Sequence, residues 1–375
     1  MNSTTRNSLA TFESAFQLLI RTAKGTVNKI NTNPRSLAKF CQILLNAKDN
    51  KNTIHMIGSG RSGNIAKIIG ESFKDIGFTV SFFGKEIDNP IKKNDVAMAI
   101  SGSGWTRYTT SAIEHCLRKN AKILTFTGSM DSKAARMSDA VIQIPLGYRS
   151  LDEGLLFTES IVPLNPLGTI FELTTLVIGM GIVNGVYSGS CANGFNNGTS
   201  NMLVSAEESF KKLTNNSELN LFIKLIKNYC NNYQSKVYFL GKGINHSISD
   251  FCSSRFKGLD ITVGSISDWR FRKTNDLLIM ISGSGSSSIL MNQVKIAKKS
   301  NLKIVYITSF PESEIISESD IKLHILGRNE NTNPDELKLV EPGIYLPIFE
   351  YTTALILESC ITQIALDLGL TNEEF

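Results

Sequence analysis

Two kinds of hydrophobic pattern alternate along this chain. Short apolar runs are typical of buried strands in a parallel sheet, and longer segments with apolar residues three or four positions apart are typical of amphipathic helices. In the first half, strands are predicted at 53–57, 78–83, 95–100, 121–126 and 140–144. The same criteria predict helices over 10–48, 63–76, 106–119, 131–138 and 167–187. Strands that alternate with helices predict an α/β fold with a mainly parallel sheet.

The second half of the chain repeats the first. Ser-Gly-Ser-Gly occurs at 101–104 and again at 282–285, and residues 301–304 match residues 120–123 at the same offset of 181. A duplicated domain explains this offset better than a solenoid, whose period would be tens of residues. Strands are predicted near 236, 260 and 277 and at 302–307, with helices over 202–232, 286–299 and from 347. We expect a first domain at 1–187, a linker rich in Gly, Asn and Ser at 188–201, and a second domain at 202–375.

Composition narrows the class of protein. The chain has 375 residues, 42% of them hydrophobic, and 39 basic against 34 acidic residues give a net charge of +5. This charge slightly favours anionic ligands, but without a basic stripe interleaved with aromatic residues it argues against a nucleic-acid partner. We see no signal peptide and no apolar stretch of about 18 residues, so we expect a cytoplasmic protein without a membrane partner. Six cysteines without C-x-x-C spacing are expected to be reduced thiols.

Two segments rich in Gly and Ser have the features of phosphate-binding loops. Each follows a predicted strand and precedes a predicted helix, where the unpaired N–H groups and the dipole of the helix N-terminus attract an anion. Glycine in such a loop lets the ligand approach the backbone closely. The alternative is a structural turn in which a serine only caps the helix. The segments are Gly58-Ser59-Gly60-Arg61-Ser62-Gly63 and Ser101-Gly102-Ser103-Gly104-Trp105-Thr106.

The first of these loops also satisfies the Gly-x-Gly-x-x-Gly pattern of dinucleotide-binding folds. That alternative requires an acidic residue at the end of the next strand, about 20 positions on. The sequence there is Phe82-Phe83-Gly84, and Glu86 comes late. Arg61 with its flanking hydroxyl groups suits a compact phosphate better than a pyrophosphate. A phosphorylated ligand is therefore the preferred interpretation.

With these loops and Pro166-Leu167-Gly168-Thr169-Ile170-Phe171-Glu172, residues 10–187 resemble the sugar isomerase (SIS) family of phosphosugar-binding domains, most of all the 6-phospho-3-hexuloisomerases. Residues 202–370 resemble a second, diverged SIS domain. The resemblance implies two tandem flavodoxin-like αβα sandwiches, each with a mainly parallel five-stranded sheet. It also implies that Glu172 moves a proton between adjacent sugar carbons through an enediol. The residues implied to hold the phosphate are Gly58, Ser59, Gly60, Arg61, Ser62, Ser101, Gly102, Ser103 and Thr106.

Two candidate catalytic residues have simpler alternatives. Glu172 could instead be a first-turn glutamate that complements the helix dipole and needs no ligand. His246 follows the first loop of the second half, where it could reach a neighbouring site, but a histidine without a catalytic role is the more common case. No His, Cys and carboxylate residues have the spacing of a metal site, so no metal or cofactor is expected.

The second half keeps only part of this chemistry. Ile244 and Asn245 replace Arg61 and Ser62, so we expect one full site and one degenerate site. The residues that outline the second site are Ser282, Ser284, Ser287 and Glu350.

The function expected from these features is an aldose–ketose isomerase that acts on a hexose 6-phosphate or a hexulose 6-phosphate. We expect a homo-oligomer or an internal pseudo-dimer. A phosphoglucose/phosphomannose isomerase and a non-catalytic phosphosugar-binding regulator are the alternatives. An enzyme is favoured because no helix-turn-helix is evident before residue 50 and because Glu172 is present. The sugar stays open, since the loops bind the phosphate and not the distinguishing hydroxyl groups.

Overall fold

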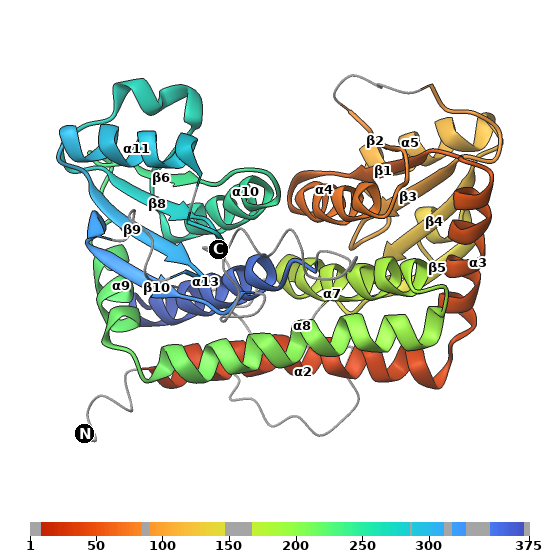
Figure 1. Ribbon diagram of the computed structural model, residues 1–375, viewed down its shortest axis with the longest axis horizontal. Helices are drawn as coiled ribbons and strands as arrows, with labels where there is room; N and C mark the ends of the chain where they lie inside the picture. Colours follow the sequence, from red (N-terminus) through yellow and green to blue (C-terminus); the bar gives the residue numbers. More distant parts are fainter. Residues whose placement is uncertain are drawn as a thin grey trace.

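The computed structural model describes residues 9–84, 90–146, 167–285, 287–310, 317–327 and 346–370. Two lobes, each built on a five-stranded sheet, lie beside each other above a layer of long helices (Figure 1). The first sheet has the order β2-β1-β3-β4-β5 and the second has the order β7-β6-β8-β9-β10. The two halves therefore share one topology, which confirms the predicted duplication of a flavodoxin-like α/β domain.

All neighbouring strands that the structure describes pair in parallel. The strand order reverses between β1 and β3, and again between β6 and β8. Open parallel sheets bind their ligands at this point, outside the carboxyl ends of the strands. The first sheet contains β1 (Ile54–Gly58), β2 (Val80–Phe82), β3 (Val96–Ile100), β4 (Lys122–Thr127) and β5 (Ala140–Gln143). The second contains β6 (Val237–Leu240), β7 (Val263–Gly264), β8 (Leu277–Ile281), β9 (Lys303–Thr308) and β10 (Ile321–His324).

Helices cover both faces of the first sheet. Along β3, Val96, Met98 and Ile100 contribute to a core on one face, and Ala97 and Ala99 contribute to a smaller core on the other. This division follows from the strand geometry, because successive side chains point to opposite faces. The large core includes α3 (Arg35–Asp49), α4 (Gly60–Asp75) and α7 (Leu167–Tyr187), and the small core includes α5 (Arg107–Arg118) and α6 (Lys133–Arg136). The lobe is an αβα sandwich.

The second lobe is built in the same way. Tyr238, Leu278 and Met280 form its smaller core with α11 (Ser288–Lys299) and a 3-10 helix at Ile266–Phe271 that contributes Trp269. The larger core includes α9 (Ser217–Lys227), α10 (Ile244–Phe256) and α13 (Ile348–Asp367). Neither α10 nor β10 was predicted from the sequence.

A layer of long helices joins the two lobes. Helices α2 (Ala10–Thr32) and α8 (Cys191–Thr214) run beneath both of them (Figure 1). Helix α2 packs against α7 of the first lobe and against α13 of the second, and the Phe12 N–H donates to Gln363 Oε1 at 3.1 Å. The rings of Phe16 and Phe210 stack with centroids 4.2 Å apart. Above this layer, α4 packs directly against α10.

The predicted linker is wrong in its local structure, because residues from Cys191 onward are helical. Its glycines allow two helices to pack closely. A Cβ at Gly194 would lie 2.7 Å from Gly185 Cα, and one at Gly198 would lie 3.3 Å from Gly181 Cα. The four glycines form two Gly-x-x-x-Gly pairs, one on α7 and one on α8, which bring the two backbones together. The domain limits at 187 and 202 stay predictions.

The cysteine prediction is wrong for one pair. Cys41 on α3 and Cys191 at the start of α8 form a disulfide, with their Cα atoms 6.2 Å apart. The other four cysteines, Cys116, Cys230, Cys252 and Cys360, are free. The pair is separated by 150 residues in sequence, so only the packing of α8 against α3 brings it together.

The expectation of no long apolar stretch also needs correction. Thr169–Tyr187 is long and apolar enough to cross a membrane, judged by length and composition. In the described structure, 94% of its apolar window is buried between α2, α3, α4 and α8. A helix that is enclosed by protein on all sides is apolar all round for this reason.

Candidate functional site

The two predicted phosphate loops of the first half lie next to each other. Gly58, the last residue of β1, pairs with Ile100, the last residue of β3. The loops that follow these strands therefore leave the sheet at one edge, at the point where the strand order reverses. This edge is where a doubly wound parallel fold holds its ligand.

The first loop turns tightly into α4. A Cβ at Gly58 would lie 2.7 Å from the Ser62 carbonyl oxygen, and Gly60 adopts a φ of +56°. A side chain would clash with the backbone at Gly58 and would strain the backbone at Gly60, so both positions favour glycine. Ser59 is exposed, Arg61 is half-buried and Ser62 is buried in the first turn of α4. The N-terminus of α4 and the Arg61 side chain together provide an electropositive edge for an anion.

The second loop has hydroxyl groups that do not cap the following helix. Ser101 Oγ donates to Thr106 Oγ1 at 3.2 Å and accepts the Gly104 N–H, and Ser103 Oγ accepts the Trp105 N–H. Thr106 is the N-cap residue of α5, and its side chain makes no capping hydrogen bond. Ser103 and Thr106 are exposed. The simple capping alternative therefore fails, and the exposed hydroxyl groups are accessible to a ligand.

Glu172 meets the first loop inside the protein. The Ser62 hydroxyl donates to Glu172 Oε1 at 2.7 Å, and the Glu172 side chain is buried. Its other oxygen, Oε2, has no hydrogen-bond partner among the described residues. Glu172 lies in the second turn of α7, not the first, and the first turn holds no acidic residue. The helix-dipole alternative is weakened accordingly, since that effect falls off within the first turn.

The electrostatics of Glu172 suit proton exchange. Burial raises the pKa of the carboxyl above its usual range. The hydrogen bond from Ser62 and the positive charges of Arg61 and Arg255 act in the opposite direction and keep the pKa from rising further. A carboxyl tuned upward by burial can act as a general base near neutral pH. Arg255 was not predicted from the sequence, because it lies in the second half and no motif marks it.

The second half keeps the backbone of one loop and changes the chemistry of the other. A Cβ at Gly283 would lie 3.2 Å from the Phe349 ring, just as one at Gly102 would lie 3.4 Å from the Phe171 ring. Ser282 and Glu350 are buried, and Ser284 is exposed, in positions equivalent to the first half. Ser287 precedes α11.

The first loop of the second half is different. Half-buried Ile244 stands where Arg61 stands in the first half, and Asn245 stands in the place of Ser62. The Asn245 Oδ1 atom is buried without a hydrogen-bond partner among the described residues. Neither Ile244 nor Asn245 provides the guanidinium or the hydroxyl group that acts on Glu172, and the degeneracy of the second site stays a prediction.

His246 lies in the first turn of α10 and is 46% exposed. Its Nε2 atom is 3.7 Å from Asp250 Oδ2 on the same helix. A catalytic role for His246 stays a prediction. Within the described part of the chain, no three His, Cys or carboxylate side chains gather as ligands for a metal ion. Pro166, part of the motif that precedes Glu172, lies outside the described residues.

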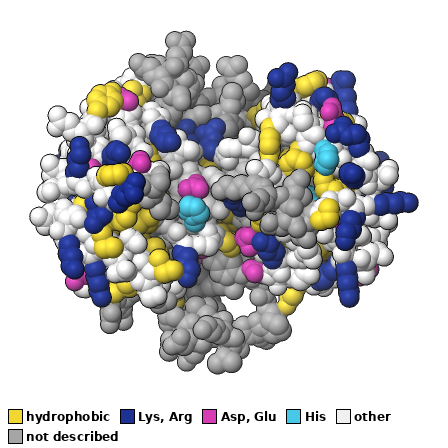
Figure 2. Space-filling view, turned by 90° about the horizontal axis from the view of Figure 1, so that it is seen from above, with side chains coloured by type: hydrophobic (Ala, Val, Ile, Leu, Met, Phe, Trp, Pro, Cys, Tyr) yellow, Lys and Arg dark blue, Asp and Glu magenta, His cyan; other side chains and the backbone are white. Residues whose placement is uncertain are grey.

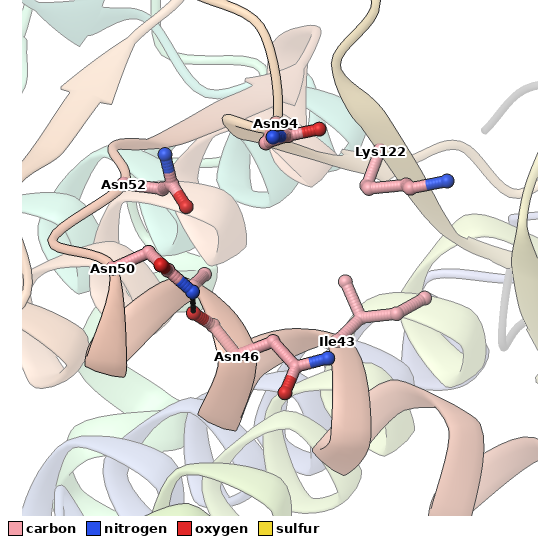
Figure 3. Close-up of a pocket in the computed structure, with 7 residues that line it drawn as sticks. Ile43, Asn46, Asn50, Asn52, Asn94 and Lys122 are labelled. Carbon is pink, nitrogen blue, oxygen red and sulfur yellow. Dashed lines mark hydrogen bonds between the residues drawn. The ribbon is translucent and has the colours of Figure 1, made fainter.

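Two cavities lie at the opposite edge of the sheets. The one in Figure 3 encloses about 630 Å³, and Asn52, Asn94 and Lys122 from the amino ends of β1, β3 and β4 line it. A cavity of about 920 Å³ in the second half is lined by Asn275 and Lys303, the equivalents of Asn94 and Lys122. Both cavities therefore belong to the repeated fold and lie away from the loops.

The face of the molecule in Figure 2 has basic side chains scattered over both lobes, with acidic ones among them. They form no continuous stripe on this face, as the even charge distribution of the sequence predicts.

Comparisons with known proteins agree with this geometry. The uncharacterized protein of Aeropyrum pernix is 30% identical over 173 residues, which are 45% of this chain and 82% of that protein. The 3-hexulose-6-phosphate isomerase of Mycobacterium gastri is 29% identical over 125 residues, 33% of this chain and 60% of the isomerase. The fold matches the crystal structure of tagatose-6-phosphate ketose/aldose isomerase from Escherichia coli with a TM-score of 0.63 at 13% identity, over 97% of this chain and 94% of that one. The model of the SIS domain family matches residues 49–163 and 233–337, more than half of the chain. The first matched range contains β1 to β5 and the second contains β6 to β10, each with its two loops. The protein therefore belongs to the SIS domain family.

Proposed function

We propose that this protein is a phosphosugar aldose–ketose isomerase of the 6-phospho-3-hexuloisomerase type, with Glu172 as its base. The observation that carries the proposal is the buried Glu172 carboxyl, bonded to Ser62 beside two Ser/Gly loops at one edge of the sheet. The likeness to the isomerase of Mycobacterium gastri supports the substrate class. A phosphate bound by the loops would place the sugar carbons near the carboxyl.

The reaction follows from the two different environments of the carboxyl oxygens. Ser62 holds Oε1, so Oε2 is the oxygen that accepts a proton. Oε2 takes the proton from the carbon next to the carbonyl group, and the C–H electron pair becomes the C=C bond of an enediolate. The neutral carboxyl then returns the proton to the former carbonyl carbon, and the hydroxyl proton moves to the other oxygen. No electron leaves the substrate, so the step needs no redox partner.

The remaining predicted residues have roles around this step. Arg61 and the hydroxyl groups of Ser101, Ser103 and Thr106 bind the phosphate through charge-assisted hydrogen bonds. His246 is proposed as a second acid–base group, because α10 packs against the helix that carries Ser62. The buried core of α7 around Glu172 limits water at the reacting carbon, so some of the transferred protons return to the sugar before they exchange with solvent.

A turnover assay with isotope exchange tests this function. The enzyme is incubated with hexulose 6-phosphate and, separately, with fructose 6-phosphate in D₂O, and both interconversion and deuterium at the transferred position are measured. We expect interconversion with deuterium incorporation, because the proton on Glu172 exchanges with solvent. Phosphosugar binding without turnover would overturn the isomerase proposal and favour a regulator. Turnover of fructose 6-phosphate alone would overturn the hexulose assignment.

Ligand binding is measured separately by fluorescence. Trp105 lies in the second loop and is 58% exposed, whereas Trp269 is buried, so a Trp269→Phe background reports on the loop. Ser103→Ala and Ser284→Ala form a matched pair, since they remove the same hydroxyl group from equivalent loops. We expect weaker binding in Ser103→Ala only. An equal effect in both variants would contradict a single full site.

A further inference from the structure

A buried ion pair lies where the two halves meet. The Arg255 guanidinium on α10 donates three hydrogen bonds to Glu358 on α13, from Nε at 3.2 and 2.9 Å and from Nη2 at 2.8 Å. The side chains are only 4% and 1% exposed. Removing two charges from water costs free energy that their attraction regains only in part, so a buried pair is weak evidence for a role in stability.

The pair lies next to the helices that carry the candidate site. Helix α10, with Arg255, packs against α4, which carries Arg61 and Ser62. Helix α13, with Glu358, packs against α7, which carries Glu172. Since α10 and α13 belong to the second half, each helix of the first site contacts a helix of the other half (Figure 1).

The charge of Arg255 acts on the Glu172 carboxyl. It lowers the pKa of that group, less strongly than Arg61 does, against the larger effect of burial. Among the described residues, the charged groups that act on this carboxyl are therefore Arg61 from α4 and Arg255 from α10. The carboxylate of Glu358, from α13, fixes the guanidinium in place through its three hydrogen bonds.

The other half has no equivalent pair. At the offset that relates the first loops, Ser72 of α4 corresponds to Arg255, and the Ser72 hydroxyl donates to the Ile68 carbonyl oxygen of its own helix. At the offset that relates Glu172 to Glu350, Met180 corresponds to Glu358. The described positions of the first half that correspond to Arg255 and Glu358 therefore hold no ion pair.

We propose that Arg255 is a positioning residue for the Glu172 site, supplied by the second half and held in place by Glu358. The proposal rests on Glu172 being the base of the proposed isomerase. It assigns the diverged second half a part in the reaction that does not depend on substrate binding in its own loops. The cation favours the ionised carboxylate, which is the form that accepts the proton from the sugar.

The test replaces the pair without leaving a lone buried charge. Arg255→Met with Glu358→Leu substitutes two apolar residues of similar volume, a change that buried ion pairs often tolerate. Arg255→Lys keeps the charge. Lys227→Met with Asp367→Leu removes an ion pair between α9 and α13 and serves as the control. Each variant is measured for its melting temperature, for kcat and KM, and for the pH profile of kcat.

We expect the Arg255→Met/Glu358→Leu variant to fold and the acidic limb of its pH profile to move to higher pH, with little change in KM. Arg255→Lys and the control should keep the limb within about 0.2 pH unit of the wild type, since the charge of Arg255 is what matters. An unchanged limb in the folded double variant would overturn the proposal.

A direct titration separates this proposal from the proposed function. The carboxyl stretch of Glu172 is followed by infrared difference spectroscopy against pH, with Glu172→Gln identifying the band. A wild-type protein without isomerase activity would refute the function, yet this titration would still test Arg255. If the midpoint does not rise in the double variant, the role of Arg255 is refuted whatever the activity.

Discussion

Replacing Glu172 with Gln separates the chemistry of the site from its structure. The amide keeps the shape of the side chain and still accepts the Ser62 hydroxyl, but it cannot take a proton from carbon. A positioned acid–base group contributes about 10²–10⁴-fold to the rate. At about 1.36 kcal/mol for each factor of ten, this corresponds to about 2.7–5.4 kcal/mol of transition-state stabilisation. We expect kcat to fall by that factor and phosphosugar binding to persist.

The same substitution should change stability in a pH-dependent way. Because burial raises the pKa of Glu172 in the folded state, the folded protein binds this proton more tightly than the unfolded chain. The stability that this proton provides is complete below the unfolded pKa and is lost as the pH rises through the folded pKa. The Glu172→Gln side chain does not titrate, so the variant does not lose this stability as the pH rises. It should gain stability relative to the wild type as the pH rises above the unfolded pKa of about 4.3, by about 1.4 kcal/mol for each pH unit by which the pKa is raised.

Two measurements test the catalytic role of Glu172 and the pH dependence of its effect on stability. Turnover is measured in a coupled isomerase assay, and the free energy of unfolding is measured by urea titration at pH 4 and pH 8. Glu350→Gln is the matched control, because Glu350 is buried at the equivalent position of α13. A folded Glu172→Gln protein with turnover within about threefold of the wild type would refute the base, since a positioned base is worth far more. An unchanged stability difference between the two pH values would refute the burial argument.

Three further predictions follow from individual residues. Arg61→Ala should weaken phosphosugar binding by roughly 10- to 100-fold, since a hydrogen bond to a charged group is worth about 1.5–3 kcal/mol; calorimetry measures it, and unchanged affinity would exclude the role. Glu350→Gln should keep most of the turnover, because Ile244 and Asn245 replace the Arg–Ser pair there, and a folded but inactive variant would show that Glu350 takes part in catalysis. Cys41→Ser should lower the free energy of unfolding by about 2–4 kcal/mol under oxidising conditions only. A thiol titration of the denatured, unreduced wild type should find four free cysteines, and six would rule out the disulfide.

The repeated fold could be predicted from the sequence because its signals are local. The apolar run at Leu277–Ile281 has the same length and the same flanking Asn-Asp and Ser-Gly residues as the run at Val96–Ile100. A strand that is buried on both faces needs such a run, so both strands were predicted within a residue or two. Helix α10 was missed because its core residues are interspersed with serines, as in Ser247, Ser249 and Ser253, which weakens the helical pattern.

What could not be predicted depends on contacts between distant segments. Gly194 and Gly198 are typical of a loop when they are considered alone, but in the structure they contact the glycines of α7. Cys41 and Cys191 carry no spacing signal that could pair them. In each case the deciding partner lies in another helix, so a local pattern could not identify it.

The candidate site likewise combines residues that local motifs predict with one that they do not. The loops and Glu172 belong to recognisable motifs, and the structure brings Ser62 and Glu172 within 2.7 Å although they are 110 residues apart. Arg255 belongs to no motif. Its helix, α10, reaches the site by packing on α4, and this packing is a property of the interface between the halves.

Fusion of the two domains in one chain is what allows this asymmetry. In a symmetric dimer of identical domains, any residue that one copy supplies to its partner is also supplied in return. A symmetric version of this protein would bury two Arg–Glu pairs and bear their desolvation cost twice. In the fused chain, Ser72 and Met180 occupy the equivalent described positions, so the cost does not arise there. A chain made of two first halves would have two complete sets of loops but no Arg255 at either site. We therefore expect each Glu172 in such a chain to titrate above the Glu172 of the natural protein, and an equal or lower midpoint would contradict this account of the second half.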